Sequence, residues 1–64
     1  MAFQKNIQRF REDKQLTQEE LAKAVGVSQP QIAKYENGVS VPNVIVGVQI
    51  AKTLGVTCEE LVND

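Results

Sequence analysis

Residues 17–37, which read TQEELAKAVGVSQPQIAKYEN, constrain the fold more than any other part of the 64-residue chain. Apolar side chains recur in this stretch at helical spacing, which gives each of two short helices one inward face. These side chains are Leu21, Val25, Val27, Ile32 and Tyr35. Ala22 is small enough for a second helix to approach closely, and Gly26 tolerates the left-handed backbone that a tight turn requires. The stretch therefore predicts two short helices that cross at a steep angle.

Both of these helices begin at residues typical of helix N-termini. Thr17 and Glu20 form the pattern of a capping box, in which each side chain bonds to the backbone N–H of the other residue. Ser28 and Gln31 offer the same pattern at the start of the second helix. The two starts are thus marked independently of the apolar pattern.

The rest of the chain also favours helices, because no strand pattern bounded by turn signals competes with them. The expected helices cover about residues 3–14, 18–25, 29–36 and 42–54, and a short one follows from about residue 57. We expect an all-α, five-helix fold that forms a single domain over residues 1–64.

The fourth expected helix contains a glycine, Gly47, where a helix interior is weakened. Ile45 and Val46 precede it and allow two interpretations. Either the helix is rotated or frayed and these residues pack locally, or they form an exposed apolar patch for self-association.

Length and composition exclude several classes of function. A chain of 64 residues builds one small core and leaves no room for an enzyme cleft, so we expect no catalysis. One cysteine and no histidine argue against an internal disulfide or a zinc site, and we expect no cofactor or small-molecule ligand. No apolar run approaches the roughly 20 residues that span a bilayer, and the first residues lack the apolar stretch of a secretion signal. These features favour a cytoplasmic protein without a membrane partner.

The net charge of −1 argues against a non-specific coat for nucleic acid, which relies on broad positive charge. The charge is unevenly distributed, however. Residues 1–34 carry six basic and four acidic side chains, a local charge of +2, whereas residues 35–64 carry one basic and four acidic, a local charge of −3. A polyanion would therefore meet the N-terminal half.

The chain resembles the helix-turn-helix domains of phage repressors and Cro proteins. LTQEELA, GVS, Ile32, YENG, a proline, IAKTLGV and a final T-x-x-E-L stand in the order and spacing of that family, between Ile7 and Leu61. The resemblance implies a sequence-specific DNA-binding regulator of transcription, with repression as the expected direction. It further implies that the third helix enters the major groove of operator DNA and that the protein binds as a homodimer.

Residues at the start and on the next outward turn of such a helix meet the edges of bases. Gln29 matches a base-contacting glutamine of related phage repressors, and Lys34 occupies another base-contacting position. Glutamine pairs with adenine through two hydrogen bonds, whereas lysine favours guanine. Pro30 stands where relatives often have a polar side chain and offers an apolar contact; it also disfavours helical angles at Gln29, so either Ser28 or Gln29 is the cap. The expected base-contacting residues are Gln29, Pro30, Gln31, Ala33 and Lys34.

Other polar residues are expected to contact the DNA backbone. Gln18, at the first position of the second helix, would direct its amide and the helix N-terminus to a phosphate. Asn37 matches a phosphate contact of the family, with the ending of the helix as its alternative role. The expected phosphate-contacting residues are Gln18, Ser28, Asn37, Arg9 and Lys14.

Arg11 and Glu36 resemble a family pair that joins the first helix to the end of the third in a partly buried salt bridge. The alternative is two unrelated surface charges, since most ion pairs are exposed and contribute little. A buried pair would orient the third helix.

Ile45 and Val46, with Leu61 in the last helix, are the outward residues expected to form a weak homodimer. The same apolar region supports a second hypothesis of a different class. In it, the chain keeps this fold but acts as a protein-interaction module, such as an antitoxin-like partner binder.

Overall fold

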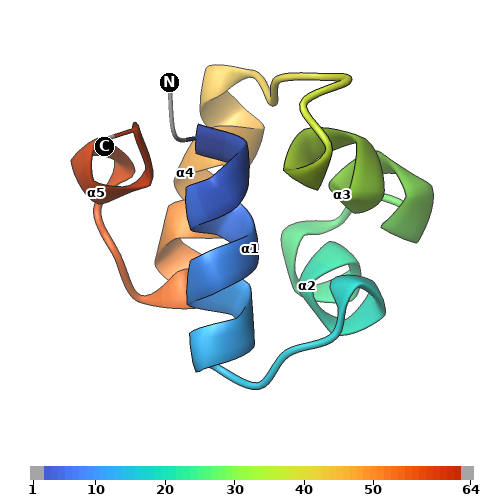
Figure 1. Cartoon of the computed structure of the whole chain (residues 1–64), viewed down its shortest axis with the longest axis horizontal. Coiled ribbons are helices and arrows are strands. Elements are labelled where there is room, and N and C mark those ends of the chain that lie inside the picture. Colours follow the sequence, from blue (N-terminus) through green and yellow to red (C-terminus); the bar gives the residue numbers. More distant parts are fainter. Residues whose placement is uncertain (1–2, 63–64) are drawn as a thin grey trace.

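The computed structural model describes residues 3–62, which fold into five α-helices and contain no strand (Figure 1). The helices are α1 (Phe3–Asp13), α2 (Gln18–Val25), α3 (Gln29–Glu36), α4 (Val44–Leu54) and α5 (Cys58–Val62). The expected all-α, five-helix fold is confirmed. Helix α1 ends one residue earlier than expected, and α4 begins at Val44, directly after Asn43, which is its N-terminal cap as the sequence suggests. Within residues 3–62, no helix combines the length and the apolar character that a membrane span needs.

The helices surround one core, with α1 in contact with α3, α4 and α5 (Figure 1). Helix α2 packs against α3 and α4, and α3 and α5 lie on opposite sides of α1. The largest fully buried side chains come from all five helices and are Ile7, Leu21, Ile32, Ile50, Leu54 and Leu61. Tyr35 is buried with them, and Val25 and Val27 pack against the core in part. The inward faces expected for α2 and α3 are therefore present.

Hydrogen bonds at the helix starts follow the caps expected from the sequence. Thr17 and Glu20 form a complete capping box, and Ser28 accepts a hydrogen bond from the backbone N–H of Gln31 at 3.3 Å. Ser28 has extended backbone angles, so it is the cap of α3 and Gln29 is the first helical residue. Pro30 lies in the first turn, where its missing N–H removes no helical hydrogen bond.

The capping box also shifts the ionisation of Glu20. The backbone N–H of Thr17 donates to its carboxylate at 2.8 Å, and this bond, with the Thr17 hydroxyl, lowers the pKa of Glu20 from its ordinary 4.5. A carboxyl group whose pKa is lowered by folding stabilises the folded state above its ordinary pKa. That contribution is lost as the pH falls through the lowered value.

Helix α4 runs through Gly47 without interruption, which excludes the frayed helix of the first interpretation. The alternative patch is correct only in part. Ile45 is 75% exposed, but Val46 packs against the core and its backbone N–H binds the Asn43 side chain. The reason is the helical spacing of this apolar run, which turns neighbouring side chains in different directions.

Leu61 does not face outward as the dimer hypothesis required. It is 1% exposed, and the side chain of Asn6 on α1 donates a hydrogen bond to its backbone carbonyl at 2.9 Å. Leu61 is the one buried residue of α5, a helix of five residues, and it attaches that helix to the core.

Two glycines provide a stability test with opposite signs. Gly47 lies inside helix α4, and a Cβ added there would have no other atom within 4 Å. Gly47→Ala should therefore raise the free energy of unfolding by about 0.5–1 kcal/mol. Gly26 also has open space but a φ of +87°, so Gly26→Ala should lower it by about 1–2 kcal/mol through backbone strain alone. Urea unfolding of both variants measures these changes. Equal effects would contradict the assigned backbone conformations.

Candidate nucleic-acid interface

Helix α3 presents a polar face to the outside and an apolar face to the core. Gln29, Pro30 and Lys34 are exposed, whereas Gln31 and Ala33 are half-buried. On the opposite face Ile32, Tyr35 and Glu36 are buried. Three of the five residues expected to contact bases are thus exposed, and the other two are exposed only in part.

The residues expected to contact phosphates do not all lie beside this face of α3. Ser28 and Asn37 are exposed at the two ends of α3, and Asn37 is also its C-terminal cap. Arg9 is exposed on α1, with its guanidinium 4.8 Å from the centre of the Phe10 ring. Lys14 instead extends to the C-terminal end of α4, where a Cβ placed on Gly55 would lie 3.3 Å from its Nζ. The structure therefore does not bring the Lys14 ammonium group to α3.

Hydrogen bonds connect the start of α3 to the start of α2. Nε2 of Gln29 donates to Oε1 of Gln18 at 2.8 Å, and Nε2 of Gln18 donates to Oε1 of Glu36 at 3.0 Å. Sequence reasoning treated Gln18 and Gln29 as separate contacts and did not identify this connection. Their separation of 11 residues matches no local motif, so only the crossing of the two helices reveals it.

Arg11 and Glu36 form a two-bond ion pair between α1 and the end of α3. Arg11 Nε lies 2.6 Å from Glu36 Oε2 and Nη2 lies 3.1 Å from Oε1, while Nη1 donates to the Leu16 carbonyl at 2.7 Å. The side chains are only 11% and 3% exposed, which excludes the alternative of two unrelated surface charges. The hydrogen bond to Glu36 raises the pKa of Arg11, so the guanidinium stays charged.

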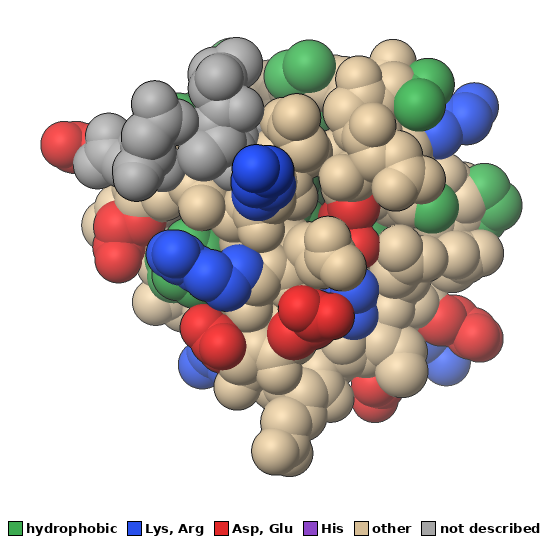
Figure 2. Space-filling view, in the orientation of Figure 1, with side chains coloured by type: hydrophobic (Ala, Val, Ile, Leu, Met, Phe, Trp, Pro, Cys, Tyr) green, Lys and Arg blue, Asp and Glu red, His purple; other side chains and the backbone are tan. Residues whose placement is uncertain are grey.

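Charges of both signs are mixed over the face that contains α1 (Figure 2). Lys and Arg side chains there have Asp and Glu side chains as neighbours. Such a surface produces no broad positive field, in keeping with the net charge of −1. This face therefore offers a polyanion few positive charges without a negative neighbour.

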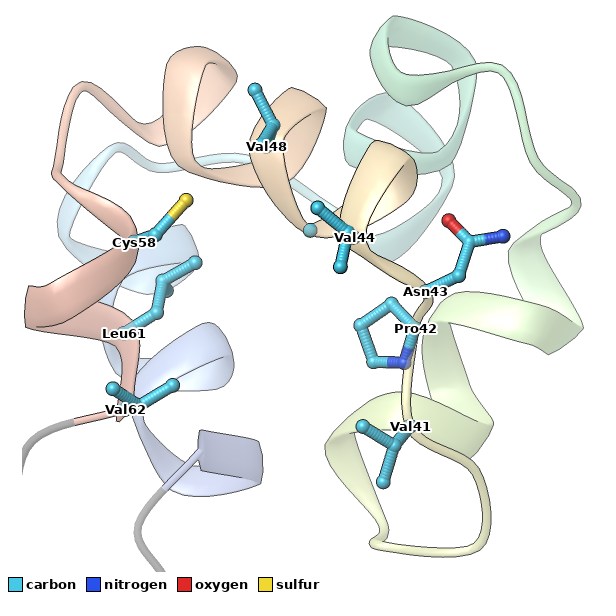
Figure 3. A pocket seen from close by; sticks show the side chains of 9 residues that line it. Val41, Pro42, Asn43, Val44, Val48, Cys58, Leu61 and Val62 are labelled. Atoms are coloured by element: carbon cyan, nitrogen blue, oxygen red, sulfur yellow. The ribbon is translucent and has the colours of Figure 1, made fainter.

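A second surface feature is an apolar groove between the start of α4 and α5 (Figure 3). Residues of the loop before α4 and of its first turn stand on one side, and residues of α5 stand on the other. The lining residues are Val41, Pro42, Asn43, Val44, Gly47, Val48, Cys58, Leu61 and Val62. The groove was not expected from the sequence, because Leu61 was placed outward, whereas it is buried and lines the groove. The signal available was the nearly continuous apolar run VPNVIVGV, which exceeds what one buried helix face can use.

Helices α2 and α3 pack against each other across a turn at Gly26, which is the arrangement of a helix-turn-helix domain. A helix-turn-helix family model matches residues 7–61 of the chain. The protein belongs to the phage repressor and Cro type of helix-turn-helix family, whose members regulate transcription by binding DNA.

Two curated relatives agree with this assignment. The chain is 40% identical over 63 residues to the HTH-type transcriptional activator BcrR of Enterococcus faecalis, a match that covers 98% of this chain and 31% of BcrR. It is 42% identical over 57 residues to the uncharacterized HTH-type transcriptional regulator y4dJ of Sinorhizobium fredii, covering 89% of this chain and 74% of that protein. The chain thus spans about a third of the length of the first relative and about three quarters of the second.

The ion pair provides a test of how α3 is held. Arg11→Met should lower the free energy of unfolding by about 3 kcal/mol, because it leaves the buried Glu36 carboxylate without its charge partner. The double variant Arg11→Met/Glu36→Leu should regain at least half of this loss, since no uncompensated charge remains. Urea denaturation gives both values. A double variant less stable than Arg11→Met would show that the loss of stability does not come from the unpaired Glu36 carboxylate.

Proposed function

We propose that this domain recognises a specific operator sequence by placing α3 in the major groove of duplex DNA. The observation that carries the proposal is the polar face of α3, on which the side chains of Gln29 and Lys34 are exposed. A helix fits into the major groove, where each base pair presents a distinct pattern of donors and acceptors. Gln29 suits adenine and Lys34 suits guanine.

The neighbouring residues suit a role in orienting the domain on the DNA backbone. Pro30, Gln31 and Ala33 complete the surface of α3 that would face the bases, with apolar contacts from the proline and the alanine. Ser28 and Asn37 at the ends of the helix, with Arg9 on α1, are proposed to contact phosphates. Gln18 keeps one amide N–H beyond those used in the structure, and we propose that this N–H reaches a phosphate.

The domain is further proposed to bind as a homodimer, because one short helix reads only a few base pairs. The surface that supports a dimer is the apolar groove, whose lining includes the exposed side chains of Val41, Val44 and Val62, together with the exposed Ile45 that follows Val44. Protruding side chains and a groove lie next to each other, so a second copy related by a two-fold axis can place its own side chains in the groove. Among the described residues that line the groove, none is charged, which favours an apolar occupant of this kind.

Repression is the proposed direction of regulation, because a domain that occupies an operator within a promoter blocks access to it. The relative named as a transcriptional activator makes a reporter assay the appropriate test. We propose a cytoplasmic location because the DNA target lies there in bacteria. Expression of the chain should lower output from a promoter that contains the selected operator.

Specific and salt-sensitive binding is the principal expected result. Selection from a random pool of duplexes should yield one consensus of two related half-sites. For a dimer that neutralises about six phosphates, the logarithm of affinity should fall with the logarithm of salt concentration at a slope of about −5. Fluorescence anisotropy at several salt concentrations measures the slope. Failure to enrich any sequence would reject the proposal and leave the protein-interaction hypothesis in its place.

A glutamine outside α3 provides the matched control for that experiment. Gln29→Ala should remove the preference at one base position of each half-site, whereas Gln49→Ala, an exposed glutamine on α4, should leave the consensus unchanged. If both variants selected the same sequence as the unmodified domain, α3 would not be the reading helix.

The dimer surface can be tested without altering charge. Val44, which is 83% exposed, and its neighbour Ile45 are replaced together in Val44→Ser/Ile45→Ser. This variant should bind a duplex with two half-sites about tenfold more weakly, with little change on a single half-site, because truncating apolar anchors weakens an interface by about 1–2 kcal/mol. Val39→Ser, at an exposed valine outside the groove, is the control. Equal losses on both duplexes would mean that this surface does not form the dimer.

A further inference from the structure

A buried carboxylate determines the direction of the hydrogen bonds that lead to Gln29. Glu36 meets Arg11 in a two-bond ion pair, with Arg11 Nε 2.6 Å from Glu36 Oε2, and a carboxylate in such a pair can only accept hydrogen bonds. The group that Gln18 turns toward Glu36 must therefore be its NH2, at 3.0 Å. The oxygen of the Gln18 amide, Oε1, then points away from Glu36 and toward Gln29.

The oxygen of Gln18 in turn determines how the amide of Gln29 is oriented. A carbonyl oxygen can only accept, so Gln29 presents its NH2 to Gln18 Oε1, at 2.8 Å. The amide of Gln29 is left with its oxygen and one N–H for other partners. An exposed glutamine without such a neighbour would be free to exchange its oxygen and nitrogen by rotation.

The remaining pair of one acceptor and one donor matches only one purine. Adenine offers the N6 amino group as donor and N7 as acceptor in the major groove, which is the complement of this pair. Guanine offers two acceptors, O6 and N7, and would need two donors. With one N–H already used by Gln18, Gln29 has a single donor left.

We propose that Glu36 is a positioning residue for base recognition, which fixes through Gln18 the orientation of the Gln29 amide and so favours adenine over guanine. The inference rests on the proposed function, because it concerns the same face of α3. Glu36 does not approach the DNA itself, since its side chain is buried at the far end of α3. It acts by removing one of the two orientations in which Gln29 could meet a base.

The test compares affinities for two duplexes that differ at one position. That position is the one whose preference disappears in Gln29→Ala, and it carries adenine in one duplex and guanine in the other. Gln18→Leu interrupts the hydrogen bonds without touching the ion pair, and Glu36→Gln replaces the acceptor with an amide that can point either way. Each variant should reduce the ratio of adenine to guanine affinity about tenfold.

Two controls separate this role from a loss of stability or of phosphate contacts. Ile50→Val weakens the core without touching the hydrogen bonds, and it should leave the ratio unchanged. Gln18→Leu also removes a proposed phosphate contact, but that loss lowers both affinities equally and cancels in the ratio. In the Gln29→Ala background, Gln18→Leu should have no further effect on the ratio.

Nuclear magnetic resonance of the free domain gives a readout that does not depend on DNA. The side-chain amide protons of Gln29 should differ from those of the exposed Gln49 in the unmodified domain and become similar to them in Gln18→Leu. An unchanged base ratio in both Gln18→Leu and Glu36→Gln would overturn the inference and leave the proposed function standing. Failure of the unmodified domain to select any duplex would overturn the proposed function, and the inference with it.

Discussion

The buried Glu36 carboxylate is the group on which the placement of α3 depends. It accepts two hydrogen bonds from Arg11 and one from Gln18, so a single side chain at the end of α3 is bonded to α1 and to the start of α2. Burying an ionised group is unfavourable unless its partners are well oriented, and this geometry provides them. Because the partners come from two other helices, any displacement of α3 breaks charged hydrogen bonds. The ion pair thus restricts where α3 can lie, whatever its net contribution to stability.

Local chemistry explains why most of the fold could be predicted from the sequence. The caps Thr17 and Ser28 and the left-handed Gly26 act over three or four residues, so their effect can be read directly from the chain. The ion pair between Arg11 and Glu36 spans 25 residues and came instead from the resemblance to a family. Position along a helix was also sufficient to identify Gln29 and Lys34 as exposed residues of α3.

The parts that could not be predicted depend on how separate helices meet. Leu61 was placed outward because one turn of helix has no clear periodicity, and only the contact of α5 with α1 shows that it is buried. Val46 and Ile45 are equally apolar, and their different burial follows from the direction in which α4 crosses the core. The hydrogen bonds among Gln29, Gln18 and Glu36 likewise join three segments whose proximity is a property of the packed structure.

The near-neutral charge links the two proposals about this domain. Broad positive charge gives many DNA-binding proteins an affinity that is independent of sequence, and the mixed charges of this chain provide little of it. Selective binding then requires that each contact lose as little conformational entropy as possible, which a pre-oriented Gln29 amide achieves. It also requires more than one reading helix, which the apolar groove between α4 and α5 can provide by joining two copies. The oriented Gln29 amide and the apolar groove would therefore each add selective affinity where general electrostatic attraction to DNA is weak.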